Sequence, residues 1–580
     1  MTVTETAQRR RAASLEELRA TERMVVHLDG HTICLLVEGA EVHAVDNRCP
    51  HMGFPLHRGS VRDGILTCHW HHARFDLCTG GTFDEWADDL RRFPVEVEGD
   101  DVYLDLRPPG DQVAHQRQRL YDGLRRNIPL VLAKAAIAVA EADRSGADAF
   151  RAGLEFGTLR RGGGWFRGLT TLTCLMNLVP RLERVERAAA LYHGLADVAS
   201  DSAMEPPRFP LDPLPGEVDP KRLGRWFRGF IEVRDADGAE RAIVSAVRSG
   251  ASPEELADIL FAAATDHRYL DGGHTLDFVN KALEALDTAG WERAEAVLAS
   301  LPPQLGFAER MEEANSWRNP VDLVALLEAA FEELPEALAG KGTWSDRSGL
   351  VQVVLTGEPQ EILDALLGAL RGGATEVELA SAVSFAAATR IARFPTSNEF
   401  GDWDTALHTF TFANAVEQGL RRSPSPELVR GVLDAAMSVH LDRFLNVPAA
   451  RLPEPQAGDA EALLAELPAL LDGQQHVDEA GQLVASYLAV GDADRLIAAL
   501  GACLLREDRN FHTIQCVEAA VRQHELLRGT EEAGLPLIAA TRYLAAHAPT
   551  ARAQRQTYEI ARRLHRGEKV YEDDSPPPAA

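Results

Sequence analysis

The sequence is short of cysteine, of basic charge and of long apolar runs, and each shortage excludes a class of protein. Seven cysteines in 580 residues are too few and too scattered for a disulfide framework, so we expect a reducing compartment, the cytoplasm. The formal net charge of −28 argues against nucleic acid as a partner, because phosphate binding needs a concentrated basic surface. No stretch approaches the roughly 18 uninterrupted apolar residues of a membrane span, so we expect no membrane-spanning segment.

The composition divides the chain into a short β-rich part and a long helical part. Between residues 24 and 107, short runs such as MVVHL, TICLLVE and VYLDL alternate with turns, which predicts a small all-β domain. From residue 108 onward the segments are rich in Ala, Leu, Glu and Arg at helical spacing, which predicts a large all-α domain. We therefore predict a multidomain protein with an N-terminal extension (1–23), the all-β domain (24–107), the all-α domain (108–571) and a disordered tail (572–580).

The all-α part contains about four quasi-repeats, with units near 126–245, 246–370, 371–488 and 489–571. Each unit opens on a glycine-containing helix start, and a second signature follows after a loop. In three units this second signature places a His-Thr pair at the same point, and the first unit has Leu-Thr there. The pairs are His274-Thr275, His408-Thr409, His512-Thr513 and Leu169-Thr170.

The repeated histidines suggest a shared site, provided that the units close around an axis. In that case His274, His408 and His512 would meet, and a carboxylate such as Asp277 or Glu399 could complete a non-haem iron site. An open solenoid would keep the three histidines apart. Thr is also a good N-cap residue, so the pairs could simply mark helix starts, although capping does not explain the repeated His.

Two residues in loops add to this hypothesis. The third unit's loop, RIARFPTSNEFGDWDTA, is longer than its counterparts by about ten residues, and insertions in repeat proteins tend to lie on one functional face. This loop carries Glu399, Asp402 and Asp404. His267 lies seven residues before His274 and could reach the same site. The candidate catalytic residues are therefore His274, His408, His512 and Glu399, with His267 as a further possible metal ligand.

Four potential metal ligands in the β-rich part have a distinctive spacing. Cys49-x-His51 is followed, after sixteen residues, by Cys68-x-x-His71, so two thiolates and two imidazoles come from two loops. This is the ligand set of a [2Fe–2S] cluster in which two His replace two Cys on one iron. Two Cys and two His also bind zinc, but zinc modules rarely lie in such a β context.

The surrounding segment NRCPHMGFPLHRGSVRDGILTCHWHHARFDLCTGG resembles the Rieske [2Fe–2S] ferredoxin family. Both ligand loops, Gly53 and the FDL-x-TG run after the second loop match the family pattern. The resemblance implies that Cys49 and Cys68 hold one iron and that His51 and His71 hold the other.

Four positions depart from the high-potential respiratory members of this family. Phe54 and Trp70 stand where those proteins have an extra disulfide, and Ala73 and Phe75 stand where they have hydrogen-bond donors near the cluster. Fewer donors to the sulfurs leave the reduced state less stabilised. We therefore expect a lower-potential cluster of the ferredoxin or oxygenase type.

The two parts together predict an iron–sulfur oxidoreductase. A tether raises the effective concentration of a redox partner, so we expect the cluster to relay electrons to the iron site for an oxygenase-like reaction on a small molecule. No flavin or nicotinamide fingerprint appears, which predicts a separate reductase or ferredoxin reductase as the electron source. The Asp/Glu-x-x-His-x₄-His motif of the familiar Rieske oxygenases is also absent. The alternative is an electron-transfer protein whose helical repeats are a docking scaffold for a separate enzyme.

Overall fold

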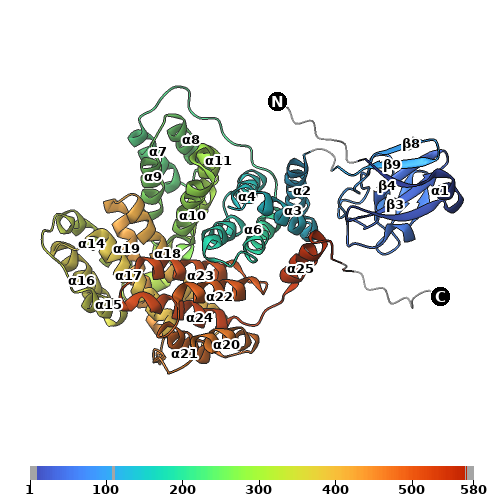
Figure 1. Ribbon diagram of the computed structural model, residues 1–580. Coiled ribbons are helices and arrows are strands. Elements are labelled where there is room, and N and C mark those ends of the chain that lie inside the picture. The colour runs from blue at the N-terminus through green and yellow to red at the C-terminus, as the bar shows by residue number, and fades with distance from the viewer. Residues whose placement is uncertain (1–8, 108–110, 569, 571–580) are drawn as a thin grey trace, which may run out of the picture. The chain divides into compact units, whose positions relative to one another are not determined.

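The computed structural model describes residues 9–107, 111–568 and 570, so the predicted tail, 572–580, lies outside the described residues. The chain forms two compact units, one within Met1–Arg144 and Gln556–Ala580 and the other within Ser145–Arg555. All strands of the described residues lie in the first unit, and the regular structure of the second is helical (Figure 1). The predicted fold class, a small all-β domain followed by a large all-α region, is confirmed.

Three antiparallel sheets of three strands each make up the β domain, with strand orders β1-β9-β8, β2-β3-β4 and β5-β6-β7. One buried apolar cluster joins Cys34, Leu66 and Phe75 of the strands to Cys49 and Cys68 of the loops. The strands are β1 (Arg9–Ser14), β2 (Arg23–Leu28), β3 (His31–Glu38), β4 (Glu41–Asp46), β5 (Ser60–Arg62), β6 (Ile65–Thr67), β7 (Arg74–Asp76), β8 (Val95–Glu98) and β9 (Asp101–Asp105).

The β domain begins earlier than the sequence predicted. β1 pairs with β9 along its length, and the helix that follows it, α1 (Leu15–Thr21), packs through the fully buried Leu18. The segment 1–23, which we expected to precede the domain, therefore contributes a strand and a helix to it. The strand lacks an apolar run because its first residues are exposed arginines that pair with carboxylates, as Arg9 does with Glu98 at 2.6 Å.

Two helices after the β domain form a hairpin that belongs to the first unit. The side chain of Asp111 caps the first, α2 (Gln112–Arg126), and the second is α3 (Pro129–Ala142). A Cβ atom at Gly123 would lie 3.0 Å from the backbone nitrogen of Leu132, so the glycine allows the two helices to approach this closely. The sequence placed this hairpin in the all-α domain, whereas its contacts group it with the β domain.

Four helices of the second unit form a closed ring, and each carries the second signature of one quasi-repeat. They are α5 (Arg167–Leu178), α10 (His274–Ala289), α18 (Phe400–Arg422) and α23 (Phe511–Leu526). Both α5 and α18 pack on α10 and on α23, so the contacts run around the ring. Three of these helices, α10, α18 and α23, are labelled in Figure 1. The quasi-repeats therefore close around an axis, while the exact boundaries of the units stay a prediction.

The second unit contains further helices besides those of the ring. They are α4 (Ala147–Arg160), α6 (Arg187–Ser202), α7 (Pro220–Glu232), α8 (Ala236–Arg248), α9 (Pro253–Thr265), α11 (Ala294–Ala299), α12 (Pro302–Phe307), α13 (Asn315–Arg318), α14 (Leu323–Leu338), α15 (Arg347–Thr356), α16 (Pro359–Arg371), α17 (Glu376–Ala392), α19 (Pro426–Asp442), α20 (Ala460–Asp472), α21 (Val477–Leu488), α22 (Ala493–Leu505) and α24 (Leu535–Ala546). The last helix, α25 (Ala553–His565), lies mostly in the first unit.

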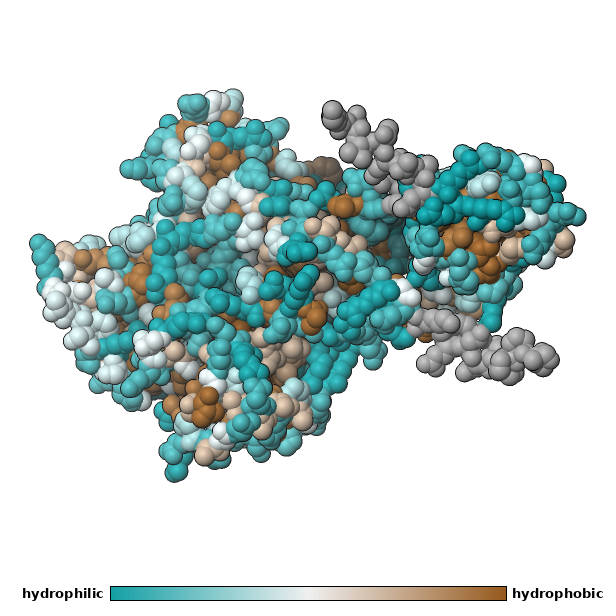
Figure 2. All heavy atoms as spheres, viewed as in Figure 1, coloured by the Kyte–Doolittle hydropathy of each residue, from teal (hydrophilic) through white to brown (hydrophobic). Residues whose placement is uncertain are grey.

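The visible surface of both units is mainly hydrophilic, with hydrophobic residues scattered over it (Figure 2). Among the described residues, none of the helices has both the length and the apolar character needed to cross a membrane.

Candidate functional site

The first ligand loop follows β4 and turns back on itself around Cys49. The Cys49 amide donates to the carbonyl of Phe54 at 2.8 Å, and the Gly53 amide donates to the carbonyl of Cys49 at 2.7 Å. Gly53 has a φ of +80°, a conformation that a residue with a Cβ rarely adopts. The second ligand loop joins β6 to β7 and is closed by a 2.8 Å hydrogen bond from the Cys68 amide to the Ala73 carbonyl.

The two loops bring two thiols together in the interior of the β domain. Cys49 and Cys68 are 3% and 1% exposed. The hydrogen bond between the two thiols and the nearby amides of Trp70 and His71 lower the pKa of Cys68 to about 6. A thiolate, the form that binds iron, is therefore accessible at neutral pH.

The same loops bring two imidazoles together at the edge of the domain. The ring centroids of His51 and His71 lie 4.9 Å apart, with Trp86 packed at 4.6 Å from His51 and Trp70 at 4.3 Å from His71. Burial lowers the pKa of His51 to about 4, and it also lowers the pKa of His71. Both rings are therefore neutral at pH 7, as ligands must be, and two thiols beside two neutral imidazoles fit the donor set of a [2Fe–2S] cluster.

The closed helical ring brings His274, His408 and His512 together, and we call these three residues the His triad. The Nε2 atom of His512 lies 3.0 Å from that of His408 and 3.5 Å from that of His274. One ring nitrogen from each residue lies within 4.8 Å of the others. Burial, with repulsion between the rings, lowers the pKa of His274 to about 2 and that of His408 to about 4. The His triad is therefore a set of neutral imidazoles whose nitrogens converge.

The threonine that follows each histidine does not cap a helix. The N-cap positions are Gly273 for α10, Glu399 for α18 and Asn510 for α23, so none of them is a threonine. The expectation that these threonines act as N-caps is therefore wrong, although the His-Thr pair does lie in the first turn of α10 and of α23. Instead Thr275, Thr409 and Thr513 are buried and hydrogen-bond to other side chains of their loops and helices.

A carboxylate of the third quasi-repeat, that of Asp404 on α18, contacts the triad. Oδ2 of Asp404 lies 3.6 Å from Nδ1 of His512, the ring nitrogen on the far side from the other two histidines. Tyr543 donates its hydroxyl hydrogen bond to Oδ1 of Asp404, and Nε2 of His547 lies 3.5 Å from the same oxygen. Burial raises the pKa of Asp404, but these partners outweigh it and hold the pKa below its ordinary range. An ionised carboxylate therefore faces His512.

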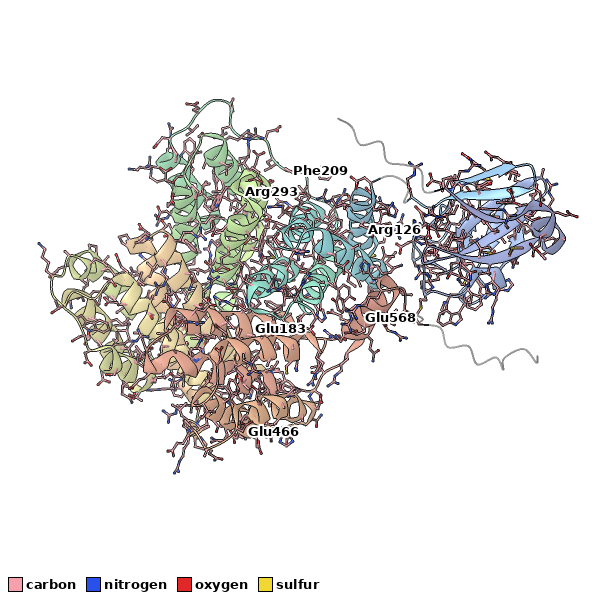
Figure 3. All side chains as sticks on the ribbon, in the orientation of Figure 1. Arg126, Glu183, Phe209, Arg293, Glu466 and Glu568 are labelled. Atoms are coloured by element: carbon pink, nitrogen blue, oxygen red, sulfur yellow. The ribbon has the colours of Figure 1, made fainter. Side chains whose placement is uncertain are left out.

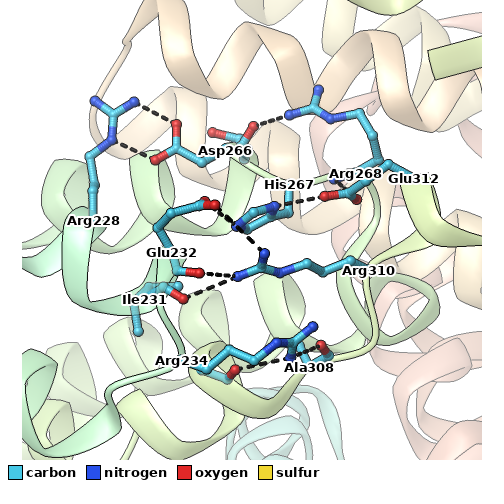
Figure 4. A network of polar contacts seen from close by, with 12 residues as sticks. Arg228, Ile231, Glu232, Arg234, Asp266, His267, Arg268, Ala308, Arg310 and Glu312 are labelled. Carbon is cyan, nitrogen blue, oxygen red and sulfur yellow. Dashed lines mark hydrogen bonds and ion pairs between the residues drawn. The ribbon is translucent and has the colours of Figure 1, made fainter. Parts of the chain in front are cut away.

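Two residues that the sequence placed at the triad lie elsewhere. Glu399 is the exposed N-cap of α18, where its side chain and that of Asp402 form a capping box. His267 lies between two carboxylates, with Nδ1 2.7 Å from Glu312 and Nε2 3.0 Å from Glu232 (Figure 4). The structure therefore gives both residues structural partners away from the triad. The signal for Asp404 was its position four residues before His408, which puts both on one face of α18.

A cavity of about 1110 Å³ is lined by Trp403, which precedes Asp404 in the chain, and by His547, which contacts Asp404. Its walls come from the long loop of the third unit and from the third and fourth units around it. Lining residues include Asn398, Phe400, Trp403, Arg509, Thr513 and His547. His547 contacts Asp404, and Thr513 adjoins His512 in the chain, so the cavity reaches the residues that surround the triad.

A buried ionic network lies further along the ring helices. Nζ of Lys281 contacts Glu284 at 2.9 Å and Glu518 at 2.6 Å, and Asn177 of α5 donates to both carboxylates. Asp277, one turn after His274, is also buried and accepts a hydrogen bond from Gln515. These contacts tie α5, α10 and α23 together below the triad.

Comparison with known proteins identifies the β domain. A model of the Rieske [2Fe-2S] domain family matches residues 9–94. Apoptosis-inducing factor 3 of Homo sapiens is 33% identical over 91 residues, which are 16% of this chain and 15% of that protein. The ferredoxin component of the naphthalene 1,2-dioxygenase system of Pseudomonas aeruginosa is 29% identical over 96 residues, 16% of this chain and 92% of the ferredoxin.

A third relative extends the same pattern. The ferredoxin component of the 2,4-dinitrotoluene dioxygenase system of Burkholderia sp. (strain RASC) is 32% identical over 74 residues, 13% of this chain and 71% of that protein. This chain thus spans most of the ferredoxin components but only 15% of apoptosis-inducing factor 3. Through residues 9–94, the chain belongs to the Rieske [2Fe-2S] domain family, whose [2Fe–2S] cluster transfers electrons.

Proposed function

We propose that Cys49, His51, Cys68 and His71 hold the cluster and that the cluster passes electrons to an iron ion bound by the His triad. The reaction at that iron is an oxygenase-like oxidation of a small molecule in the cytoplasm. The electrons come from a separate reductase or ferredoxin reductase. The ferredoxin components among the relatives support this last step, because by name they belong to dioxygenase systems of several proteins.

The observation that carries the metal site is the convergence of three imidazole nitrogens from three separate repeats. Without a metal, three neutral rings can share at most a few hydrogen bonds among their converging nitrogen atoms. A divalent metal ion accepts all three lone pairs, and imidazole suits iron as well as zinc. The carboxylate of Asp404 on Nδ1 of His512 supports the same interpretation, because metal-bound histidines almost always donate their other ring N–H to such a group.

The protein's own residues would orient the reaction in three ways. Asp404 fixes the tautomer of His512 so that Nε2 carries the free lone pair. Tyr543 and His547 hold Asp404 in place. The cavity beside them offers room for a small-molecule substrate. When bound, the iron would activate dioxygen with electrons from the cluster.

The docking-scaffold alternative depended on an open stack of repeats with a concave surface. The contacts among α5, α10, α18 and α23 close the stack into a ring. We therefore favour the enzyme over the scaffold.

The iron content of the purified chain tests the proposal. One [2Fe–2S] cluster accounts for about two irons per chain, and the site at the His triad adds a third. The double variant His274→Ala, His408→Ala should lose the added iron and keep the visible absorption of the cluster. His267→Ala is the matched control, because its partners are carboxylates outside the triad. An iron content that is the same in the double variant and the wild type would disprove the metal site.

A further inference from the structure

The helical hairpin α2–α3 contacts the first ligand loop between its two cluster ligands, Cys49 and His51. Nζ of Lys134, on α3, donates to the carbonyl of Pro50 at 2.6 Å. Pro50 stands between Cys49 and His51 in the chain. The lysine side chain is only 17% exposed, so water screens its charge less than that of a surface lysine.

A single carboxylate holds this lysine in place. Asp88 forms an ion pair with Lys134, and its other oxygen accepts from Nε of Arg119, on α2, at 2.8 Å. Arg119 also donates to the carbonyl of Ala87 at 3.1 Å. Arg119 also lies 3.4 Å from Asp122, so two cations face two carboxylates, and the ammonium of Lys134 is the charge of this group that contacts the first ligand loop.

The contact between Lys134 and Asp88 also lies close to His51, a cluster ligand. The ring of Trp86, two residues before Asp88, packs at 4.6 Å from the ring of His51. His51 is half-buried, whereas His71 at the other side of the site is exposed. The hairpin, Gln112–Ala142, lies beyond the part of the chain that matches the Rieske family, so Lys134 reaches the first ligand loop from outside the matched residues.

We propose that Lys134 sets the reduction potential of the cluster by holding a positive charge on the first ligand loop. Reduction adds one electron to the cluster, and a nearby cation stabilises the more negative reduced form. The proposal rests on the cluster being held by the two ligand loops. It does not depend on the His triad, because it is measured on the cluster alone.

Redox titration of the full-length chain, followed by the absorption and the electron paramagnetic resonance signal of the cluster, tests this role. At a fixed potential, Lys134→Met should lower the ratio of reduced to oxidised cluster about tenfold. For a one-electron couple this corresponds to a midpoint potential that is lower by about 59 mV. Asp88→Asn removes a negative charge from the same contact, so its midpoint should move upward. Lys134→Arg keeps the charge and should restore most of the wild-type value.

The opposite signs of the first two variants separate charge from packing. Loss of packing would disturb the cluster in the same direction in both, and it would alter the resonance spectrum. Arg126→Gln is the matched control, because Arg126, the last residue of α2 (Figure 3), pairs with Glu85 on the surface, where the two side chains are 40% and 55% exposed and water screens their charges. Equal midpoints for Lys134→Met and the control, or shifts of the same sign in Lys134→Met and Asp88→Asn, would overturn the proposal. A chain with no Rieske-type resonance signal would instead refute the cluster ligands themselves.

Discussion

Asp404→Asn should weaken metal binding at the His triad without unfolding the helical unit. The substitution keeps the shape of the side chain and removes the negative charge that lies 3.6 Å from Nδ1 of His512. Two unit charges at that distance interact by about 5 kcal/mol at an effective dielectric constant of about 20. A histidine bound to a metal carries only part of a unit charge on its outer N–H, so the loss is a fraction of this value.

We therefore expect the affinity to fall by about 10- to 100-fold, or about 1.4 to 2.7 kcal/mol, the range for outer carboxylates of metal-bound histidines. Competition between the iron-depleted triad and a chromophoric chelator for Fe²⁺, measured without oxygen, gives the affinity. Tyr543→Phe removes the hydrogen bond to Asp404 but keeps the carboxylate, so it should weaken binding less.

Asp402→Asn is the control for the position, because Asp402 lies in the same turn of α18 and accepts from the amide of Glu399. Equal affinities for wild type, Asp404→Asn and this control would show that the carboxylate does not support a metal ligand.

Two further predictions concern the buried charges of the ring helices. Lys281→Met should lower the free energy of unfolding by about 3–5 kcal/mol in urea titrations, because it leaves the buried carboxylates of Glu284 and Glu518 with only the more distant Arg522, at 4.0 and 3.9 Å. The exposed pair of Arg495 and Glu461 provides the control, and Arg495→Gln should cost much less because water screens that pair; equal losses in the two variants would argue against this reasoning. Burial raises the pKa of Asp277 from 3.8 to about 7, so its contribution to stability is present below about pH 4 and is lost as the pH rises through about 7. Asp277→Asn should therefore become more stable relative to the wild type between about pH 4 and pH 7, by at most about 4 kcal/mol, and parallel pH profiles of the two proteins would contradict the raised pKa.

The sequence predicted the β domain well because its information is local. Cys49, His51, Cys68 and His71 lie in two short loops, and their spacing alone specified the ligand set. The same local reasoning missed β1, because the exposed arginines of that strand conceal its pairing with β9. The strand could be predicted only with knowledge of its pairing with β9 and of the carboxylates, such as Glu98, that its arginines contact.

The helical site was predictable only in part, because it depends on contacts between distant helices. The repeated His-Thr pairs indicated equivalent positions, but closure of the ring is a property of the packing of α5, α10, α18 and α23. The carboxylate was assigned to Glu399 because the segment from Arg390 to Ala406 reads as a loop. In the structure α18 begins at Phe400, so Asp404 lies inside the helix and Glu399 outside it.

The ring of quasi-repeats has one corner without a nitrogen donor. At the position of the three histidines, the first unit has Leu169, whose side chain packs close to Gly157 of α4. Four equivalent histidines would saturate a tetrahedral ion, as in closed sites that only stabilise a fold. In the proposed iron site, Leu169 would leave one coordination position vacant, and a vacant position is what a metal needs to bind a reactant.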